Sequence, residues 1–330
     1  MKKAYCTFPG MNKQAIDILK NNNIELTINN TAYRANGEEL ISLLIEYDIL
    51  IIGIKSFITK DILQYIKTPK IIATSSIGLD HIDKEVIDSE LVKVINIKTA
   101  NSLSVAEHIF SLILALNKRI YESNNLVLNH NGNRSIIHDT PQDISEKTLG
   151  LIGAGNITKE VIKIATVFNM KINCYTRNPS KHQDLLQYNV NFVSLDDVLK
   201  QSDIVNISIP LTYETNNLIS KDKIKLLKPT ATFINTSRRD IVDTNALIEY
   251  ADKNTSFYVG LDIDLDNYED LFAKYRDNVI VTPHTAGVSK QAYFLNKKYY
   301  TNKNSVIFNT LPFLHILFLF LHISFLRLTL

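Results

Sequence analysis

Cysteine and net charge are both scarce in this sequence of 330 residues. The two cysteines, Cys6 and Cys174, do not have the spacing of a metal site, so we expect no metal ligands and a reducing compartment. A formal net charge of +2 offers no electrostatic case for binding nucleic acid. No apolar stretch follows Lys2 and Lys3, which predicts a cytoplasmic protein without a signal peptide.

The longest apolar run of the sequence is at its end, residues 311–330, LPFLHILFLFLHISFLRLTL. About 20 residues is close to the shortest helix that spans a bilayer. Residues poorly suited to a bilayer core interrupt the run, namely Pro312, His315, His322, Ser324 and Arg327. We therefore favour a buried or partner-covered helix, or an abnormal C-terminus, over a membrane anchor.

The first 98 residues alternate short apolar runs with helical patterns. The expected strands are Ala4–Cys6, Ile24–Ile28, Ile49–Ile52, Ile71–Ala73 and Val92–Ile95. The expected helices between them are Asn12–Lys20, Glu38–Ile45 and Thr59–Ile66. This alternation predicts a parallel sheet that helices cover on both faces.

The alternation restarts after an interruption. The segment SVAE at 104–107 has the pattern of a capping box, which predicts that a long helix begins there. Residues 122–147 are polar and rich in Asn, and we expect a surface loop. The strands expected next are 148–152, 171–175, 190–193, 204–209, 231–235, 257–262 and 279–282. Among the helices between them, Ser194, Ser220 and Asp243 are expected N-caps.

Two doubly wound α/β domains follow from this pattern, with the second inserted into the first. A chain of 330 residues with 45% hydrophobic and 21% charged residues is long enough for both cores. The expected domains are 1–98 completed by 285–310, and 99–284. Residues 311–330 form a tail of open role.

The most informative segment is TLGLIGAGNITKEVIKIATVFNMKINCYTR at 148–177. An apolar run ends in two glycines, a helical pattern follows, and a second apolar run closes the unit. This order is typical of a dinucleotide site. Gly153 permits the tight turn, and Gly155 lets the backbone approach a pyrophosphate at the helix N-terminus. The expected pyrophosphate-binding residues are Gly153, Gly155, Asn156 and Ile157.

Two positions depart from the dinucleotide pattern. Thr158 replaces the third glycine, which we expect to space the helix from the sheet and weaken pyrophosphate binding. A carboxylate is usual at the end of the second strand, but Tyr175, Thr176 and Arg177 stand there. Arg177 is either a solvated loop cation or, with Thr176, a group that accepts a 2′-phosphate. The cofactor is therefore predicted to be NAD or NADP, with NADP slightly favoured.

Four further segments follow expected strands and carry small, polar or charged residues: 74–80, 235–240, 260–262 and 281–287. Small residues in the first segment predict backbone N–H groups that hold a carboxylate. Arg238 offers a cation and His284 a proton, at the sheet edge where ligands bind. Taken singly, Arg238 also reads as a surface ion pair, His284 as a structural histidine and Asp262 as a helix cap. Taken together, they predict hydride transfer between a nicotinamide and a 2-oxo acid.

These segments resemble the D-isomer-specific 2-hydroxyacid dehydrogenase family, which includes phosphoglycerate, D-lactate, glyoxylate/hydroxypyruvate and erythronate-4-phosphate enzymes. The resemblance rests on SSIGLDHID at 75–83, NSLSVAEHI at 101–109, LGLIGAGNI at 149–157, PLTYET at 210–215, NTSRRDIVD at 235–243 and TPHTAG at 282–287. It implies a Rossmann cofactor domain inserted into a flavodoxin-like substrate domain, and a homodimer formed through the cofactor domain. It also implies reversible oxidation of a D-2-hydroxy acid with NAD or NADP.

The resemblance further implies roles for matching residues. Arg238 matches the arginine that grips the substrate carboxylate and carbonyl, and His284 matches the proton donor and acceptor. Substrate contacts are implied for Ser76, Ile77, Gly78, Asn101 and, near a substrate phosphate, Lys55. Cofactor contacts are implied for Pro210, Thr236 and Asp262, beside the glycine turn and the pair Thr176 and Arg177.

Two departures from the family pattern concern the catalytic loops. Relatives carry a glutamate that pairs with the catalytic histidine, whereas Asn267 stands at that position here. The carboxylates near enough in sequence to substitute are Asp264, Asp266 and Glu269. Arg239 replaces the glycine that usually follows the arginine. A catalytically silent dinucleotide-binding sensor on the same fold is therefore the alternative, and the substrate stays open.

Overall fold

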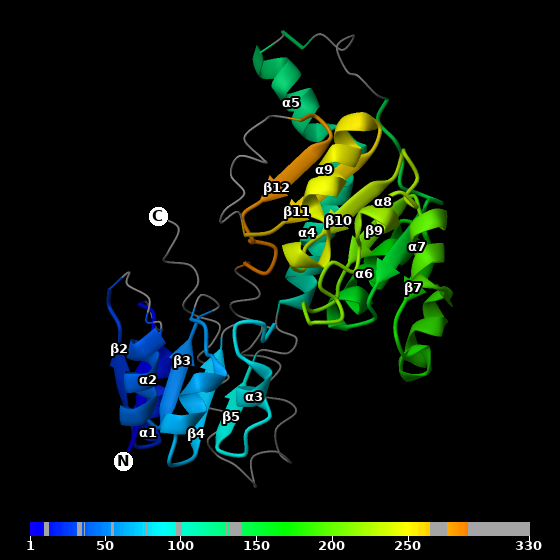
Figure 1. Ribbon diagram of the computed structural model, residues 1–330. Helices are drawn as coiled ribbons and strands as arrows, with labels where there is room; N and C mark the ends of the chain where they lie inside the picture. The colour runs from blue at the N-terminus through cyan, green and yellow to red at the C-terminus, as the bar shows by residue number, and fades with distance from the viewer. Residues whose placement is uncertain are drawn as a thin grey trace. The chain divides into compact units, whose positions relative to one another are not determined.

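The computed structural model describes residues 1–9, 13–31, 35, 37–53, 56–74, 76, 78–96, 101–129, 131–132, 140–264 and 276–289 (Figure 1). These residues form two compact units: Met1–Ala100 with Val288 and Ser289, and Asn101–Gly287. Each unit has its own parallel sheet and its own apolar core.

The first unit contains a five-stranded sheet of β1 (Lys2–Cys6), β2 (Ile24–Ile28), β3 (Ile49–Ile52), β4 (Lys70–Thr74) and β5 (Val92–Ile95). The strands are all parallel and pair in the order β2-β1-β3-β4-β5, which is the flavodoxin-like order. The helices described here are α1 (Lys13–Asn21), α2 (Gly37–Glu46), α3 (Lys84–Ile87) and the 3₁₀ helix η1 (Lys60–Tyr65).

Both faces of this sheet are covered. In β3, Ile49 and Ile51 belong to one apolar cluster, together with Leu19 of α1. Leu50 and Ile52 belong to a second cluster, to which α2 and η1 also contribute. Successive side chains of a strand point to opposite faces, so a strand that is apolar throughout needs partners on both sides. The expected architecture of this unit is confirmed.

The second unit contains a seven-stranded sheet of β6 (Thr148–Ile152), β7 (Lys171–Tyr175), β8 (Val190–Phe192), β9 (Ile204–Ile207), β10 (Thr232–Asn235), β11 (Tyr258–Asp262) and β12 (Val279–Thr282). All pairs are parallel, in the order β12-β11-β10-β9-β6-β7-β8. The winding reverses between β6 and β9. In Rossmann sheets the ligand lies at the carboxyl ends of the strands beside such a reversal.

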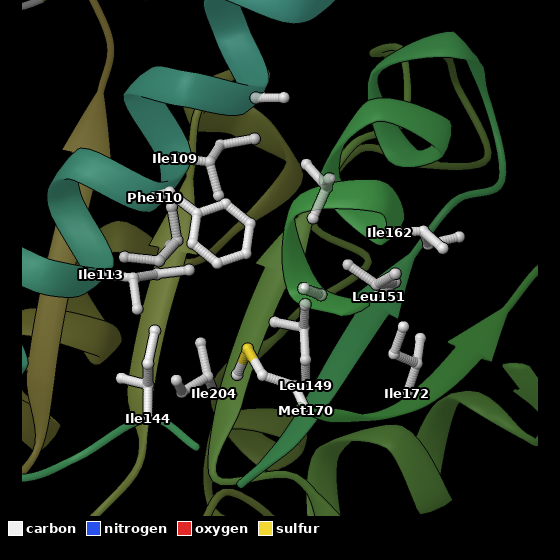
Figure 2. Close-up of a cluster of buried hydrophobic side chains, with 14 of the residues drawn as sticks. Ile109, Phe110, Ile113, Ile144, Leu149, Leu151, Ile162, Met170, Ile172 and Ile204 are labelled. Atoms are coloured by element: carbon white, nitrogen blue, oxygen red, sulfur yellow. The ribbon is translucent and has the colours of Figure 1, made fainter. Parts of the chain in front are cut away.

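The second sheet is also packed on both faces. One cluster includes side chains of α4 (Ser102–Asn117) and α6 (Asn156–Val167), which pack against each other. Figure 2 shows Ile109 and Phe110 of α4 in this cluster with Leu149 and Leu151 of β6. Ile152, the next residue along β6, belongs to the opposite cluster with α7 (Leu195–Gln201), α8 (Lys221–Ile224) and α9 (Thr244–Lys253). The alternation along β6 thus sorts the helices onto two faces.

The predicted start of α4 is wrong. The helix begins at Ser102, so the segment 104–107 lies inside its first turns and is not a capping box. The N-cap, Asn101, makes no side-chain capping bond. Buried apolar positions define which face of a helix packs, but they do not define its first residue.

The expected surface loop 122–147 is wrong in its first part, which is helical. This helix, α5, spans Ile120–Asn129. It buries Glu122 and Leu126 but leaves most of its side chains at least partly exposed. A helix with so little buried surface has no clear apolar periodicity to reveal it.

Two of the three expected N-caps are confirmed. Oγ of Ser194 accepts a hydrogen bond from the N–H of Asp197 at 3.1 Å, and Oδ1 of Asp243 accepts one from Ala246 at 3.0 Å. Ser220 holds the N-cap position of the four-residue helix α8 but makes no side-chain capping bond.

Within the described ranges, no helix has both the length and the apolar character that a bilayer crossing requires. The run 311–330 lies outside those ranges. The same ranges contain no group of three or more His, Cys, Asp or Glu residues that could hold a metal ion. Cys6 and Cys174 are buried free thiols, and burial raises the pKa of each to about 12.

Candidate active site

The glycine turn after β6 has a backbone that requires glycine. Gly153 has a φ of +107°, and a Cβ there would lie 2.4 Å from the carbonyl oxygen of Ser208. Gly155 is the N-cap of α6, and no described atom lies within 4 Å of the place where its Cβ would be. The start of α6 is therefore open beside Gly155. The first N–H groups of a helix carry the partial positive charge that binds a phosphate.

Thr158 stands where the pattern expects the third glycine, and it is fully buried in the first turn of α6. Its hydroxyl donates a hydrogen bond to the carbonyl oxygen of Gly153 at 3.0 Å. Thr158 thereby connects the helix to the glycine turn that precedes it. The weaker pyrophosphate binding expected of this residue stays a prediction.

The end of β7 is joined to the glycine turn, because the N–H of Gly153 donates to the carbonyl oxygen of Tyr175 at 2.9 Å. Thr176 and Arg177 come next, with Thr176 half-buried and Arg177 exposed. A hydroxyl and a guanidinium both donate hydrogen bonds to phosphate oxygens. Neither Thr176 nor Arg177 carries the negative charge that would repel a 2′-phosphate, and the choice between NAD and NADP stays a prediction.

Arg238 lies just after β10 in a loop that is held by side-chain hydrogen bonds. The amide of Asn235 donates to the carbonyl oxygen of Arg238 at 2.9 Å and accepts from the N–H of Ser237 at 3.0 Å. The guanidinium of Arg238 is half-buried and donates to the carbonyl oxygen of Ser237 at 3.0 Å. Arg239 begins the 3₁₀ helix η4 (Arg239–Ile241) and pairs with Asp240 at 2.8 Å, so a side chain fits at this position.

His284 and Asp264 come together although 20 residues separate them. Nδ1 of His284 lies 2.9 Å from Oδ2 of Asp264. The side chains of His284 and Asp264 are 22% and 49% exposed, so the pair is open to solvent. His284 also has a φ of +54°, a conformation that is unusual for a residue other than glycine. Of the candidate carboxylates, Asp266 and Glu269, like Asn267, lie outside the described residues.

Asp262 at the end of β11 is fully buried. Its carboxylate accepts hydrogen bonds from the hydroxyl of Thr282 at 2.5 Å and from the N–H groups of Thr285 and Ala286, both at 2.8 Å. Nε2 of His108 lies 3.8 Å from the same carboxylate. With its oxygens occupied in this way, Asp262 holds the loop that carries His284. The implied contact of Asp262 with the cofactor stays a prediction.

These groups share one edge of one sheet. Because all seven strands are parallel, the glycine turn, Arg238, Asp262 and His284 all follow carboxyl ends. β10, β11 and β12 are neighbours, so Arg238 and His284 follow strands that lie about 10 Å apart. Pro210 after β9 is exposed and Thr236 after β10 is nearly buried, at the same edge.

The expected substrate loop of the first unit follows β4. Oγ of Ser76 donates to the carbonyl oxygen of Gly78 at 2.6 Å, and the N–H of Ser76 lies 3.4 Å from Oγ1 of Thr74. Ser76 is buried and Gly78 is half-buried. The N–H of Ser76 is directed at its own loop, and the expected substrate contacts of Ser76 and Gly78 stay predictions. Ile77 and Lys55 lie outside the described residues.

Asn101 belongs to the second unit and packs against Gly287. A Cβ on Gly287 would lie 2.5 Å from Nδ2 of Asn101. Oδ1 of Asn101 is buried, with no hydrogen-bond partner among the described residues. Its expected contact with the substrate stays a prediction.

Comparison with known proteins identifies the family. A family model described as D-isomer specific 2-hydroxyacid dehydrogenase, NAD binding domain, matches residues 110–286. The chain belongs to the D-isomer-specific 2-hydroxyacid dehydrogenase family. The fold class and the oxidoreductase class expected from the sequence are thereby confirmed.

Individual dehydrogenases and reductases match most of the chain. The hydroxypyruvate reductase of Thermotoga maritima is 32% identical over 286 residues, which cover 86% of this chain and 90% of the relative. The structure of D-lactate dehydrogenase from Aquifex aeolicus, complexed with NAD and lactic acid, has a TM-score of 0.73 at 28% identity, covering 88% of this chain and 90% of that one. An acyclic imino acid reductase in complex with NADPH and D-Arg has a TM-score of 0.77 at 26% identity, covering 91% and 97%.

Sequence reasoning assigned no role to His108 or Thr282, although both lie in segments that carry the dehydrogenase resemblance. Nε2 of His108 lies 3.0 Å from Oγ1 of Thr282, and 174 residues separate the two. The only sequence signal was a histidine within the apolar helix 102–117. A pairing across this distance in the chain has no local pattern.

Proposed function

We propose that this dehydrogenase interconverts a small 2-oxo acid and a D-2-hydroxy acid, with His284 as the proton donor and Arg238 as the carboxylate-binding group. The observation that carries the proposal is the 2.9 Å contact between Nδ1 of His284 and Asp264. A carboxylate on Nδ1 orients the imidazole and makes Nδ1 the protonated nitrogen, which leaves Nε2 to exchange a proton with substrate. Asp264 then takes the place of the glutamate found in relatives.

The proposed reaction needs one hydride and one proton. A nicotinamide cofactor, when bound at the carboxyl edge of the second unit, would supply the hydride in reduction and accept it in oxidation. Arg238 holds the substrate carboxylate through two parallel N–H donors and polarises the 2-oxo group. As C2 becomes tetrahedral, protonated His284 passes its Nε2 proton to the oxygen on C2 and becomes neutral. Oxidation follows the same steps in reverse, so His284 then acts as the base.

The residues at the carboxyl edge of the second unit fit a dinucleotide. The positive φ of Gly153 and the open start of α6 beside Gly155 suit a pyrophosphate. We assign the second unit as the cofactor domain and the first unit as the substrate domain. The second unit is Asn101–Gly287, so it extends three residues beyond the expected boundary at residue 284. Thr176 and Arg177 support a slight preference for NADPH, because no carboxylate there repels the 2′-phosphate.

A substrate panel tests the proposal. Purified protein is assayed with glyoxylate, hydroxypyruvate, pyruvate and 3-phosphohydroxypyruvate, each with NADH and NADPH. An amine is added in parallel, because one structural relative is an imino acid reductase. We expect turnover of at least one 2-oxo acid without the amine. The His284→Gln variant should lose turnover but still bind cofactor in a fluorescence titration.

Two other outcomes of the panel are informative. Cofactor binding without turnover of any acid would contradict the proposal and favour the dinucleotide sensor.

The preference between NADH and NADPH is measured in the same fluorescence titrations. Thr176→Asp should move preference toward NADH by repelling the 2′-phosphate, and a wild type that strongly prefers NADH would remove this role of Thr176 and Arg177.

We also propose that the enzyme is a cytoplasmic homodimer formed through the second unit. α5 exposes a stripe of apolar side chains: Ile120 at 57%, Tyr121 at 57%, Val127 at 67% and Leu128 at 71%. Positions seven apart lie on one helix face, so these side chains form one surface suited to a second copy of the chain. Light scattering should show a dimer for wild type and a monomer for Val127→Glu with Leu128→Glu. A wild-type monomer would contradict the assignment.

A further inference from the structure

One polar network beside His284 takes no direct part in the proposed reaction. Asp262 accepts from the hydroxyl of Thr282 and from the N–H groups of Thr285 and Ala286. His108 of α4 adds a fourth contact, because its Nε2 lies 3.0 Å from Oγ1 of Thr282. These residues lie on either side of His284 in the chain. His284 itself makes none of these contacts.

The network encloses a strained residue. His284 has a φ of +54°, where L-residues are rarely found, and its N–H donates to the carbonyl oxygen of Thr282 at 2.9 Å. Such conformations persist only where the surroundings over-determine them. Here Asp262 holds the residue two before His284 and the two residues after it. The backbone of His284 is thereby held from both sides.

The hydrogen-bond donors and acceptors around Thr282 show that His108 donates to it. The hydroxyl of Thr282 has one proton and two nearby acceptors, the carboxylate of Asp262 at 2.5 Å and the carbonyl oxygen of Leu261 at 3.3 Å. Neither acceptor can donate, so the proton of Thr282 is committed to them. Oγ1 of Thr282 must then accept from His108, which requires a proton on Nε2. His108 is therefore a donor to this network. An apolar side chain in its place would remove that donor.

α4 contacts the loop at a second point. Asn101 packs against Gly287, at the opposite end of the loop from Thr282. Asn101 and His108 are seven residues apart, which places them on the same face of α4. The helix thus supports both ends of the segment that carries His284.

We infer that His108 is a positioning residue for the proton donor His284, acting through Thr282 and Asp262. The inference deepens the proposed function and rests on it. His108 does not touch the substrate in this role. It donates to Thr282, and the clamp centred on Asp262 in turn keeps His284 in its left-handed conformation, with Nδ1 toward Asp264.

Three substitutions test the inference on the full-length enzyme. His108→Leu removes the Nε2 donor and should lower kcat for 2-oxo acid reduction about 10- to 100-fold, as expected when a reacting group is misplaced. KM for the cofactor should change less than about twofold, because the substitution removes no group that is proposed to bind the cofactor. His108→Gln carries an N–H near the position of Nε2 and should recover most of kcat. Ser111→Ala, an exposed site one turn along α4, serves as the control.

Amide hydrogen exchange provides a readout that does not depend on catalysis. The N–H groups of Thr285 and Ala286 are bonded to Asp262, so they should exchange slowly in wild type. Exchange at both should be roughly tenfold faster in His108→Leu and near wild type in His108→Gln.

The outcomes separate this inference from the proposed function. Wild-type kcat and wild-type exchange in His108→Leu would overturn the positioning role. A His108→Gln enzyme as impaired as His108→Leu would also overturn it, since the donor would not matter. If wild type reduces no 2-oxo acid, the proposed function fails. The exchange rates then test by themselves whether His108 stabilises the hydrogen bonds to Asp262. Faster exchange in His108→Leu would support this stabilisation, and equal exchange would refute it.

Discussion

The two units hold their strand-end loops by different chemistry. After β4 the groups are two hydroxyls and an imidazole: Oγ1 of Thr74 lies 3.0 Å from Oγ of Ser76 and 2.9 Å from Nε2 of the buried His81. After β12 the carboxylate of Asp262 accepts from a hydroxyl and two N–H groups. A hydrogen bond to a charged group contributes about 1.5–3 kcal/mol, against about 1 kcal/mol for a neutral one. The stronger acceptor holds the loop that carries a reactive side chain in a strained backbone.

The largest expected effect comes from removing the charged acceptor. Asp262→Ala leaves the hydroxyl of Thr282 and the N–H groups of Thr285 and Ala286 without their partner. We expect a loss of stability of about 3 kcal/mol or more, and nearly complete loss of turnover. Scanning calorimetry should show a lower Tm for this variant. An Asp262→Ala enzyme with wild-type Tm would show that the carboxylate does not stabilise the loop after β12, and the contrast between the two loops would fail.

The next effect concerns the cation that is proposed to bind the substrate carboxylate. Arg238→Lys keeps the charge but loses the planar pair of donors. It should lower kcat/KM by on the order of 3 kcal/mol, which is roughly a hundredfold, with little change in Tm. Steady-state kinetics of the purified variant measure this loss. Near-normal turnover would remove Arg238 from the active site.

A third effect tests the partner of His284. The carboxylate of Asp264 lies 2.9 Å from Nδ1 of His284 and orients the imidazole. Asp264→Asn replaces the carboxylate with a neutral amide, which is a weaker acceptor, so kcat for reduction should fall about tenfold. Steady-state kinetics measure this loss. Asp266→Asn and Glu269→Gln are matched controls and should leave kcat unchanged. A loss in either control, without one in Asp264→Asn, would transfer the role to that carboxylate.

The smallest effect belongs to the loop after β4 in the first unit. Thr74→Val is nearly isosteric and removes the hydroxyl that lies between Ser76 and His81. We expect a cost of about 1 kcal/mol, measured as a small decrease in Tm. Thr282→Val removes the corresponding hydroxyl of the second unit and should cost more. Equal costs would mean that the charged acceptor adds nothing to its loop.

Much of the fold was accessible from the sequence, because strands reveal themselves locally. Apolar runs such as Ile49–Ile52 and Leu149–Ile152 must be buried on both faces, and this requirement alone predicts a parallel sheet between layers of helices. The glycine turn was equally accessible, since Gly153 and Gly155 stand between a strand and a helix. Helix α5 was missed because its exposed side chains follow no apolar period.

The sequence also predicted which residues gather at the sheet edge, but not how they pair. It placed Arg238 and His284 after parallel strands, whose carboxyl ends share one edge. It offered three carboxylates as partners for His284. The path of the chain after β11 decides which of them reaches Nδ1. Among the residues that the structure describes, Asp264 lies there.

The two doubly wound units, the glycine turn and the positions of the reactive residues follow from local patterns, because each depends on a period or on the end of a strand. Three pairings follow from long-range packing alone: the bonds of buried Asp262 to the loop of His284, the contact of Asp264 with His284, and the contact of His108 with Thr282. These pairs join residues 20 to 174 positions apart. Contacts at such separations depend on how strands and helices pack, and packing leaves no periodic trace in a single sequence.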